Sequence, residues 1–379
     1  MKHWLKWALL AGTVLLASCQ DMAIYHYNRG LDAIDEGDNL AAVNHFEKSL
    51  TYRDDADARL NLGVAYYTTS DYERALEQFE IVLRVFPGDP DLHYNLAQTY
   101  EKLGRNQSAM REYDVAIRLK RDFHQAMVAY GRLLLESGGL DSAEDILVRA
   151  MATKPSYYPT YIYLGWLYAK KDKHHQATHY LYRALKADPG SVEARLGLGY
   201  TFLKRKLYTE SLNAYQKVYV LEPENVEALL GLGLTNNALD HPDQGIEFLE
   251  KALEIQPEFP EAYKGLGDAY KKKKQFVAAI ANYRLAIQQR PGYVEAYTSV
   301  GALLAMTGHY EEAMESYDRA QVEAPDDPWI LYYVGQLYMD MNETERAKRY
   351  FQKSFDLAQT DADLRVLLSN SLKEIRGEK

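Results

Sequence analysis

Three histidines in the segment His174–His179 have the clearest capacity for metal chemistry. His175 and His179 stand four residues apart, which places both imidazoles on one face of a helix, as two ligands of one ion require. The H-E-x-x-H pattern is absent from the chain, and no third ligand stands close by in the sequence. We therefore interpret these residues as surface histidines and predict no metal site.

Residue patterns for covalent catalysis are missing as well. The chain holds no G-x-S-x-G nucleophile elbow, and Gly197 and Gly199 fall inside a predicted helix rather than in a phosphate-binding turn. Cys19 is the only cysteine, which excludes an internal disulfide and a metal cluster of several cysteines. We expect no catalytic residue, no cofactor and no enzyme activity. A cryptic enzyme built from scattered carboxylates is the least favoured alternative.

Glycine recurs along the chain at a constant spacing of 34 residues, which predicts stacked copies of one helix-turn-helix unit. The glycines of this series are Gly131, Gly165, Gly199, Gly233, Gly267, Gly301 and Gly335, with Gly63 on the same grid and Ala97 between them. When this residue is numbered position 8, nine copies result, and they begin at Ala56, Pro90, His124, Tyr158, Val192, Val226, Pro260, Val294 and Pro328.

Other positions of the copy predict two closely packed helices. Position 20 is alanine in most copies, position 24 is always large, and position 32 is proline where one copy joins the next, except at Arg121. Small residues at 8 and 20 let the helices approach, and proline at 32 ends the second helix. Turn residues at position 15, such as Gly104, end the first helix. The copy that begins at Val226 departs most, with Asn236 at 11 and Gly245 at 20, and we expect it to be the softest.

These features together resemble the tetratricopeptide repeat family, which carries Leu-Gly at 7 and 8, an aromatic at 11, Ala at 20, an aromatic or Leu at 24 and Pro at 32. The resemblance covers Ala56 to about Asp361, and a degenerate copy begins near Ala23, so residues 23–361 are expected to hold ten repeats. It implies an all-α fold, a right-handed superhelix or α-solenoid of helix-turn-helix units. Residues 362–379 are expected to form a capping helix.

The N-terminus carries a second signal. Met1–Lys6 holds two lysines, and Trp7–Ala17 is an apolar stretch of signal-peptide length. The sequence Leu16-Ala17-Ser18-Cys19 then resembles the lipobox of bacterial lipoproteins. A plain secretory peptide and an N-terminal membrane helix are the alternatives.

The lipobox resemblance has consequences for location. It implies that residues 1–18 are a signal peptide, that residues 19–22 form a short anchor and that Cys19 carries lipid, palmitate included. Several acyl chains on one cysteine anchor a protein stably. Because Gln20 rather than aspartate follows the cysteine, the resemblance further implies an outer-membrane location with the repeats on the periplasmic face.

The charge of the chain disfavours nucleic acid as a partner. The formal charge is −10, and removing residues 1–18 deletes two lysines and makes it −12. Nucleic-acid affinity depends on basic patches, and the one dense basic run is Lys271–Lys274. This run closes a first helix, where positive charge favours the helix C-terminus, so we interpret it as a solvated helix end.

The family resemblance also implies where a partner binds, since first-helix positions 2, 5, 6, 9, 12 and 13 form the concave wall. In the middle of the array these positions hold a largely apolar set with one arginine: Val128, Arg132, Ile162, Tyr163, Trp166, Leu196, Tyr200, Leu203, Leu230 and Leu234. Position 6 is glycine in three successive copies (Gly197, Gly231 and Gly265), which predicts room for an incoming backbone. The alternative is that these side chains close the superhelix against itself.

We therefore predict a non-enzymatic scaffold that binds a protein partner of the bacterial envelope and reaches the membrane through its lipid. It is similar in plan to lipoproteins that assist pilus secretins or exopolysaccharide export. A receptor that binds a peptide or a glycan in the apolar groove is the alternative. Pairing of two copies into a homo-oligomer stays open.

Overall fold

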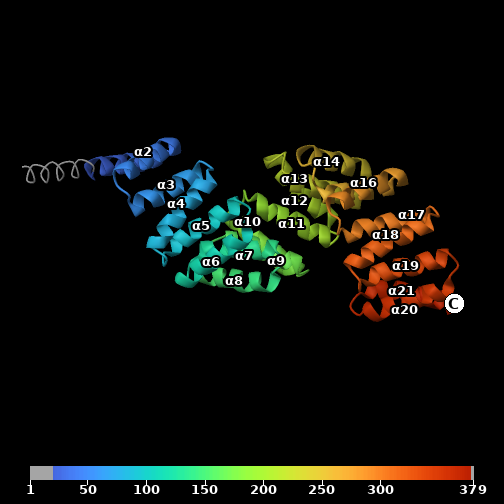
Figure 1. Ribbon diagram of the computed structural model, residues 1–379. Helices are drawn as coiled ribbons and strands as arrows, with labels where there is room; N and C mark the ends of the chain where they lie inside the picture. Colours follow the sequence, from blue (N-terminus) through green and yellow to red (C-terminus); the bar gives the residue numbers. More distant parts are fainter. Residues whose placement is uncertain (1–19, 377–379) are drawn as a thin grey trace, which may run out of the picture. The chain divides into compact units, whose positions relative to one another are not determined.

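The computed structural model describes residues 20–376, and every regular element in that range is an α-helix. The described residues form two compact units, one ending at Pro189 and the other beginning at Gly190, and each unit is a series of helix hairpins (Figure 1). The predicted all-α fold of helix-turn-helix repeats is confirmed. Within residues 20–376 no helix combines the length and apolar content needed to cross a bilayer.

The first unit holds an N-terminal hairpin and four regular copies. Residues 20–35 are helical and pack on α2, Asn39–Tyr52. The regular copies are α3 (Ala56–Thr68) with α4 (Tyr72–Val85), α5 (Pro90–Lys102) with α6 (Asn106–Leu119), α7 (His124–Glu136) with α8 (Leu140–Thr153), and α9 (Pro159–Lys170) with α10 (His174–Ala187).

The second unit holds five regular copies and a final single helix. The copies are α11 (Val192–Lys204) with α12 (Tyr208–Leu221), α13 (Val226–Ala238) with α14 (Pro242–Ile255), α15 (Pro260–Lys272) with α16 (Phe276–Gln289), α17 (Val294–Met306) with α18 (Tyr310–Glu323), and α19 (Pro328–Asp340) with α20 (Thr344–Leu357). The final helix is α21, Ala362–Arg376.

The first helices begin where the glycine spacing predicts. Eight of the nine start at position 1 of their copy, and α9 starts one residue later, at Pro159 rather than Tyr158. Proline suits the first position of a helix, because its missing N–H is not needed there. Tyr158 before it already has helical backbone, with φ −61° and ψ −28°, so the difference is confined to the end of the helix.

Glycine at position 8 makes room for the large side chain at position 24 of the same copy. A methyl group on Gly63 would lie 2.6 Å from Phe79, and one on Gly165 would lie 2.4 Å from Leu181. Both of these large side chains are fully buried. The helix pair closes directly on the glycine backbone, so a larger residue at position 8 would force the two helices apart.

The turn inside each copy adopts left-handed backbone at position 15. Gly104 has a φ of +70°, and Gly138 and Gly308 behave alike. Lys206 and Lys274 adopt φ values of +59° and +57° at the same position although lysine disfavours that conformation. The packing of the flanking helices therefore determines the left-handed backbone at position 15, and glycine only lowers its conformational cost.

Ion pairs tie the end of one first helix to the second helix of the preceding copy. Lys171 lies 2.6 Å from Asp141 and 2.5 Å from Glu144. In the other unit, Lys273 lies 2.6 Å from Asp243. The basic run Lys271–Lys274 thus closes α15 and forms ion pairs with Asp240, in the turn between α13 and α14, and with Asp243 of α14. These contacts agree with the interpretation of the run as a solvated helix end.

The copy formed by α13 and α14 carries two amide side chains, Asn236 and Asn237, at positions 11 and 12. Asn237 is buried, and its amide nitrogen donates to the carbonyl oxygen of Gly265 at 2.9 Å. Gly245 stands where most copies have alanine, and a methyl group there would lie 2.0 Å from the side-chain oxygen of Asn237. The glycine and the asparagine therefore compensate each other.

Helix α21 covers the last copy of the second unit. Leu364 and Leu368 are fully buried and pack in one cluster with Phe351 of α20. The indole nitrogen of Trp329 donates to Asp361, the residue before α21, at 2.8 Å. The aromatic side chains Trp329 and Tyr332 of α19 thus pack against the cap.

Candidate functional site

The predicted groove residues of the first unit lie on two neighbouring helices. Val128 and Arg132 belong to α7, and Ile162, Tyr163 and Trp166 belong to α9, which contacts α7 directly. Val128 and Ile162 are each only 5% exposed, so they serve mainly to pack these helices together. Tyr163, Trp166 and Arg132 are partly exposed, so a partner can reach these three members of the predicted set.

Arg132 is held by two carboxylates. Its guanidinium pairs with Glu101 of α5 and lies 2.7 Å from Glu136 of its own helix. Burial lowers the pKa of Arg132, but Glu101 and Glu136 outweigh it and leave the pKa above its ordinary value. The hydroxyl of Tyr113 donates to the other oxygen of Glu101 at 3.0 Å. Arg132 is therefore a fixed link between α5 and α7 beside the predicted groove.

The predicted groove residues of the second unit also lie on two helices in contact. Leu196, Tyr200 and Leu203 belong to α11, and Leu230 and Leu234 belong to α13. Leu196 is 6% exposed, whereas the other four are partly exposed.

Two members of this set, Leu230 and Tyr200, contact other residues of the chain. Leu230 packs against the cluster of Leu249 and Leu266, which anchors α13 to the next copy. The ammonium group of Lys204 lies 5.5 Å from the centre of the Tyr200 ring. The ten predicted residues thus fall into two sets of five, one in each unit, and their union in a single stripe stays a prediction.

Two of the three glycines at position 6, Gly231 and Gly265, do not leave the inner wall open. A methyl group on Gly231 would lie 2.3 Å from the ring of Tyr215, and one on Gly265 would lie 3.0 Å from Leu234 and 3.1 Å from Leu249. The chain's own side chains occupy the space that the sequence had assigned to an incoming backbone. The expectation was wrong for these two glycines, because the large residue at position 24 reaches into the next copy.

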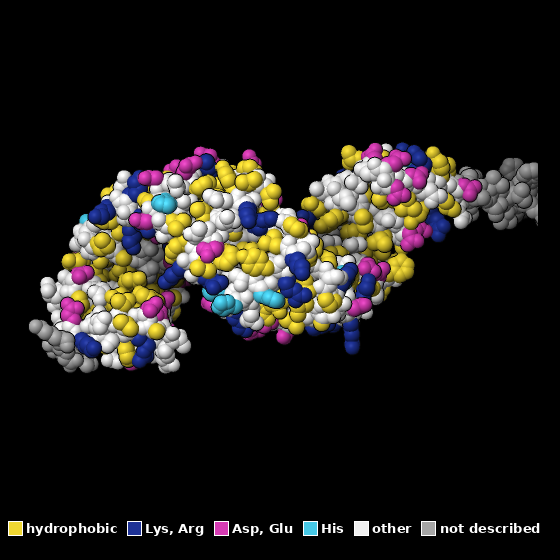
Figure 2. All heavy atoms as spheres, turned by 180° about the vertical axis from the view of Figure 1, so that it is seen from behind, with side chains coloured by type: hydrophobic (Ala, Val, Ile, Leu, Met, Phe, Trp, Pro, Cys, Tyr) yellow, Lys and Arg dark blue, Asp and Glu magenta, His cyan; other side chains and the backbone are white. Residues whose placement is uncertain are grey.

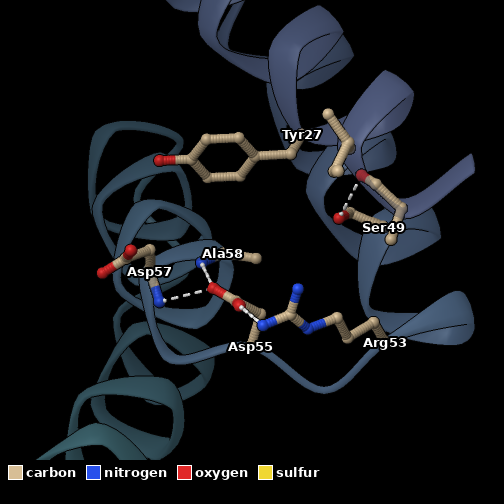
Figure 3. A pocket seen from close by; sticks show the side chains of 8 residues that line it. Tyr27, Ser49, Arg53, Asp55, Asp57 and Ala58 are labelled. Carbon is tan, nitrogen blue, oxygen red and sulfur yellow. Dashed lines mark hydrogen bonds and ion pairs between the residues drawn. The ribbon is translucent and has the colours of Figure 1, made fainter. Parts of the chain in front are cut away.

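A small pocket of about 180 Å³ lies at the N-terminal hairpin, where Tyr27 extends from the first helix towards α3 (Figure 3). Asp55 caps α3 by accepting from the backbone N–H of Asp57 at 3.0 Å and Ala58 at 3.4 Å. Arg53 lies 3.2 Å from the same carboxylate. The Asp55 carboxylate is therefore already bound to Arg53 and to the start of α3, and both interactions stabilise the fold.

The histidine segment shows no metal-binding arrangement in the described part of the chain. His175 and His179 are exposed on α10, and no group of three or more histidine, cysteine or acidic side chains among residues 20–376 is placed to hold an ion. The predicted lipidation residue, Cys19, lies outside the described residues. Figure 2 shows basic and acidic side chains interspersed on the face it presents, with hydrophobic ones between them.

Sequence reasoning did not select Glu101 and Glu136, the two partners of Arg132. Glu101 occupies position 12 of its copy, and Arg132 occupies position 9 of the next, so both lie on the inner wall of adjacent first helices. The opposite charges of Glu101 and Arg132 at these two positions could have predicted the ion pair from the sequence.

Family models and relatives agree with this architecture. A model described as Tetratricopeptide repeat matches residues 27–90, 65–122, 94–159, 164–226, 238–294 and 264–328, and a second of the same description matches residues 330–361. Human DnaJ homolog subfamily C member 3 is 32% identical over 105 residues, which are 27% of this chain and 20% of that protein. Photosystem I assembly protein Ycf3 of Prochlorococcus marinus (strain NATL1A) is 32% identical over 87 residues, 22% of this chain and 50% of that protein. The chain therefore spans half or less of the length of these relatives.

Solved structures share the fold at low identity. A tetratricopeptide repeat protein from Parabacteroides merdae ATCC 43184 aligns with a TM-score of 0.53 and 20% identity over 67% of this chain and 98% of that chain. Human IFIT1 aligns with a TM-score of 0.63 and 15% identity over 85% of this chain and 81% of that chain. Yeast Tom70 aligns with a TM-score of 0.51 and 15% identity over 93% and 96%. Because the family models match most of the sequence and the helices follow the same 34-residue register, the chain belongs to the tetratricopeptide repeat family.

Proposed function

We propose that this protein is a non-enzymatic scaffold that binds a protein partner through the inner-wall helices of its repeats. Lipid on Cys19 holds it at the outer membrane, where it helps to assemble a secretion, pilus or exopolysaccharide complex. Repeats of this family generally mediate protein–protein interaction and are generally not catalytic. Photosystem I assembly protein Ycf3, which matches part of the chain, is an assembly protein by its name.

The observation that carries the proposal is the pair of partly exposed aromatic side chains, Tyr163 and Trp166, on α9. Their helix packs on α7, and α7 is tied to α5 through Arg132 and Glu101. Aromatic side chains on a rigid support give large contact area at small entropic cost, which is why they dominate protein interfaces.

Site-specific photocrosslinking in the native host tests the inner wall. A photoreactive phenylalanine replaces Tyr163 or Trp166, and the matched control replaces Tyr182, a 56%-exposed tyrosine on the second helix α10. We expect one dominant envelope protein to crosslink from the α9 positions and not from position 182. Equal crosslinking from all three positions, or adducts only within the chain, would contradict the proposal.

The anchor is tested separately. Growth with an alkyne fatty acid is expected to label the chain, and Cys19→Ser is expected to lose both the label and the membrane fraction. An unlabelled chain that still fractionates with membranes would remove lipid attachment from the proposal and leave the inner wall untouched.

A further inference from the structure

The outer side of the first unit carries a cleft of about 610 Å³ between α6 and α8, with α7 as its floor. Three arginines line it: Arg118 of α6, Arg121 of the following loop and Arg149 of α8. The floor is apolar and includes Tyr130 and Leu134.

Three of the residues that line the cleft depart from the repeat pattern. Position 11 is an aromatic in most copies but is Leu134 here. Position 7 is leucine or valine in every other regular copy but is Tyr130 here. Position 32 is proline at every other joint between regular copies but is Arg121 here. All three line one cleft.

The preceding copies show what normally fills this space. The hydroxyl of Tyr66, at position 11, donates to Glu47 of the preceding second helix, and Tyr100 donates to Glu80 at 3.0 Å in the same way. Asp114 occupies the corresponding acidic position before Leu134, which offers no hydroxyl. Asp114 instead lies 2.8 Å from Arg118, and the gap between α6 and α8 stays open.

Two of the arginines keep their charge available. Among residues 20–376 neither Arg121 nor Arg149 forms an ion pair, and both are exposed. Guanidinium groups bind carboxylates through paired N–H donors, and the apolar floor beside them suits an aliphatic or aromatic side chain. An occupant with an acidic group next to an apolar one matches both features.

We propose that this cleft is a second docking site, on the outer face, for an acidic peptide segment of a partner protein. A carboxylate of the segment pairs with Arg121 or Arg149, and a neighbouring apolar side chain packs on Tyr130 and Leu134. Asp114 and Asp145 also line the cleft, so a segment with one or two carboxylates fits it better than a polyanion such as nucleic acid or an anionic membrane.

The test begins with a phage-displayed library of random peptides selected on the full chain. Selected peptides are expected to carry Asp or Glu beside Leu, Ile or Phe. Their dissociation constants are then measured by fluorescence anisotropy against Arg149→Glu and Arg121→Glu. We expect about tenfold weaker binding to each variant, with the loss shrinking at high salt.

A second variant tests whether binding depends on the shape of the cleft as well as on the charge of its arginines. Leu134→Tyr restores the residue that other copies carry at position 11 and fills the cleft without disturbing the repeat, so binding is expected to weaken about tenfold at unchanged thermal stability. Arg319→Glu is the matched control, because Arg319 occupies the position of Arg149 in another copy and Leu304 stands at its position 11. Its affinity is expected to stay within about twofold of the parent.

Three outcomes overturn the proposal. The selection yields no acidic peptides, or the peptides bind the Arg149→Glu and Leu134→Tyr variants as tightly as the parent. In the third, Trp166→Ala abolishes binding while Arg149→Glu retains it, which places the peptide on the inner wall.

Discussion

At the scale of single residues, Gly245 and Asn237 show that the residue preferred at one repeat position depends on the side chain packed against it. Alanine is the usual residue at position 20, and Ala177 and Ala279 are fully buried there. Gly245 takes that position in the copy of α13 and α14, and a methyl group on it would lie 2.0 Å from the side-chain oxygen of Asn237. The usual residue of the family is therefore unfavourable at this one position.

We predict that Gly245→Ala destabilises the second unit by about 1–3 kcal/mol, because the added methyl group overpacks the interface. To escape the clash, Asn237 would have to give up its hydrogen bond to the carbonyl of Gly265. Urea unfolding followed by circular dichroism, with hydrogen exchange on α13 and α14, measures the effect.

The double variant Asn237→Ala/Gly245→Ala is the control for this prediction. It places alanine at both positions and removes the clash, so its loss should be smaller than the sum of the two single losses. Additive losses would show that the clash is not what makes Gly245 necessary.

At the scale of helices, most boundaries were predictable because proline and glycine act locally. The 34-residue grid predicts the start of eight first helices to the residue, and the ninth begins one residue later, at Pro159. The space next to Gly231 was not predictable in the same way. Tyr215 fills it from the preceding copy, and such a contact depends on how far a side chain reaches across a joint.

The candidate site was less predictable than the fold. Repeat positions predicted which helices carry Trp166 and Tyr200, and the contacts of α7 with α9 and of α11 with α13 agree with that expectation. They did not predict that Val128 and Ile162 are buried, since burial depends on the neighbouring helix. The departure at Arg121 was visible in the sequence, but only the structure places it in a cleft.

The capping helix gives a prediction at this scale. Leu368 of α21 is fully buried, whereas the adjacent Leu367 is 39% exposed. We predict that Leu368→Ala costs about 3 kcal/mol through the lost apolar contact and the cavity it leaves. Helix α21 should then become sensitive to limited proteolysis, while the first unit keeps its resistance.

Leu367→Ala is the matched control, because it removes the same atoms from the same helix. Its cost is expected to stay below about 1 kcal/mol. If the two variants lose stability equally, α21 is not packed as a cap on the last copy.

At the scale of the whole molecule, buried tyrosines make the stability of the fold depend on pH. The chain holds 32 tyrosines, and burial raises the pKa of Tyr66, Tyr94, Tyr168 and Tyr293 to about 12. Burial is the largest cause in each case, and nearby carboxylates such as Glu47 beside Tyr66 and Glu144 beside Tyr168 add to it. These groups are spread over both units, so their ionisation acts on every part of the described fold.

The sign of the effect follows from linkage. A group whose pKa is higher in the folded than in the unfolded chain stabilises the fold fully below the unfolded pKa, which is 10.0 for tyrosine, and this contribution is lost as pH rises towards about 12. We therefore predict alkaline unfolding in that window. The buried tyrosines should ionise only as helical circular dichroism disappears.

Tyrosinate absorbance and circular dichroism, recorded together from neutral pH upwards, test this order of events. The chain in concentrated guanidinium is the reference, where all tyrosines should ionise in one transition near 10. A single transition near that pH in the native chain, with the helices retained, would contradict the prediction. It would mean that solvent reaches the tyrosines of positions 11 and 24 without opening the helix pairs, against the burial of Tyr113 and Tyr283 between them.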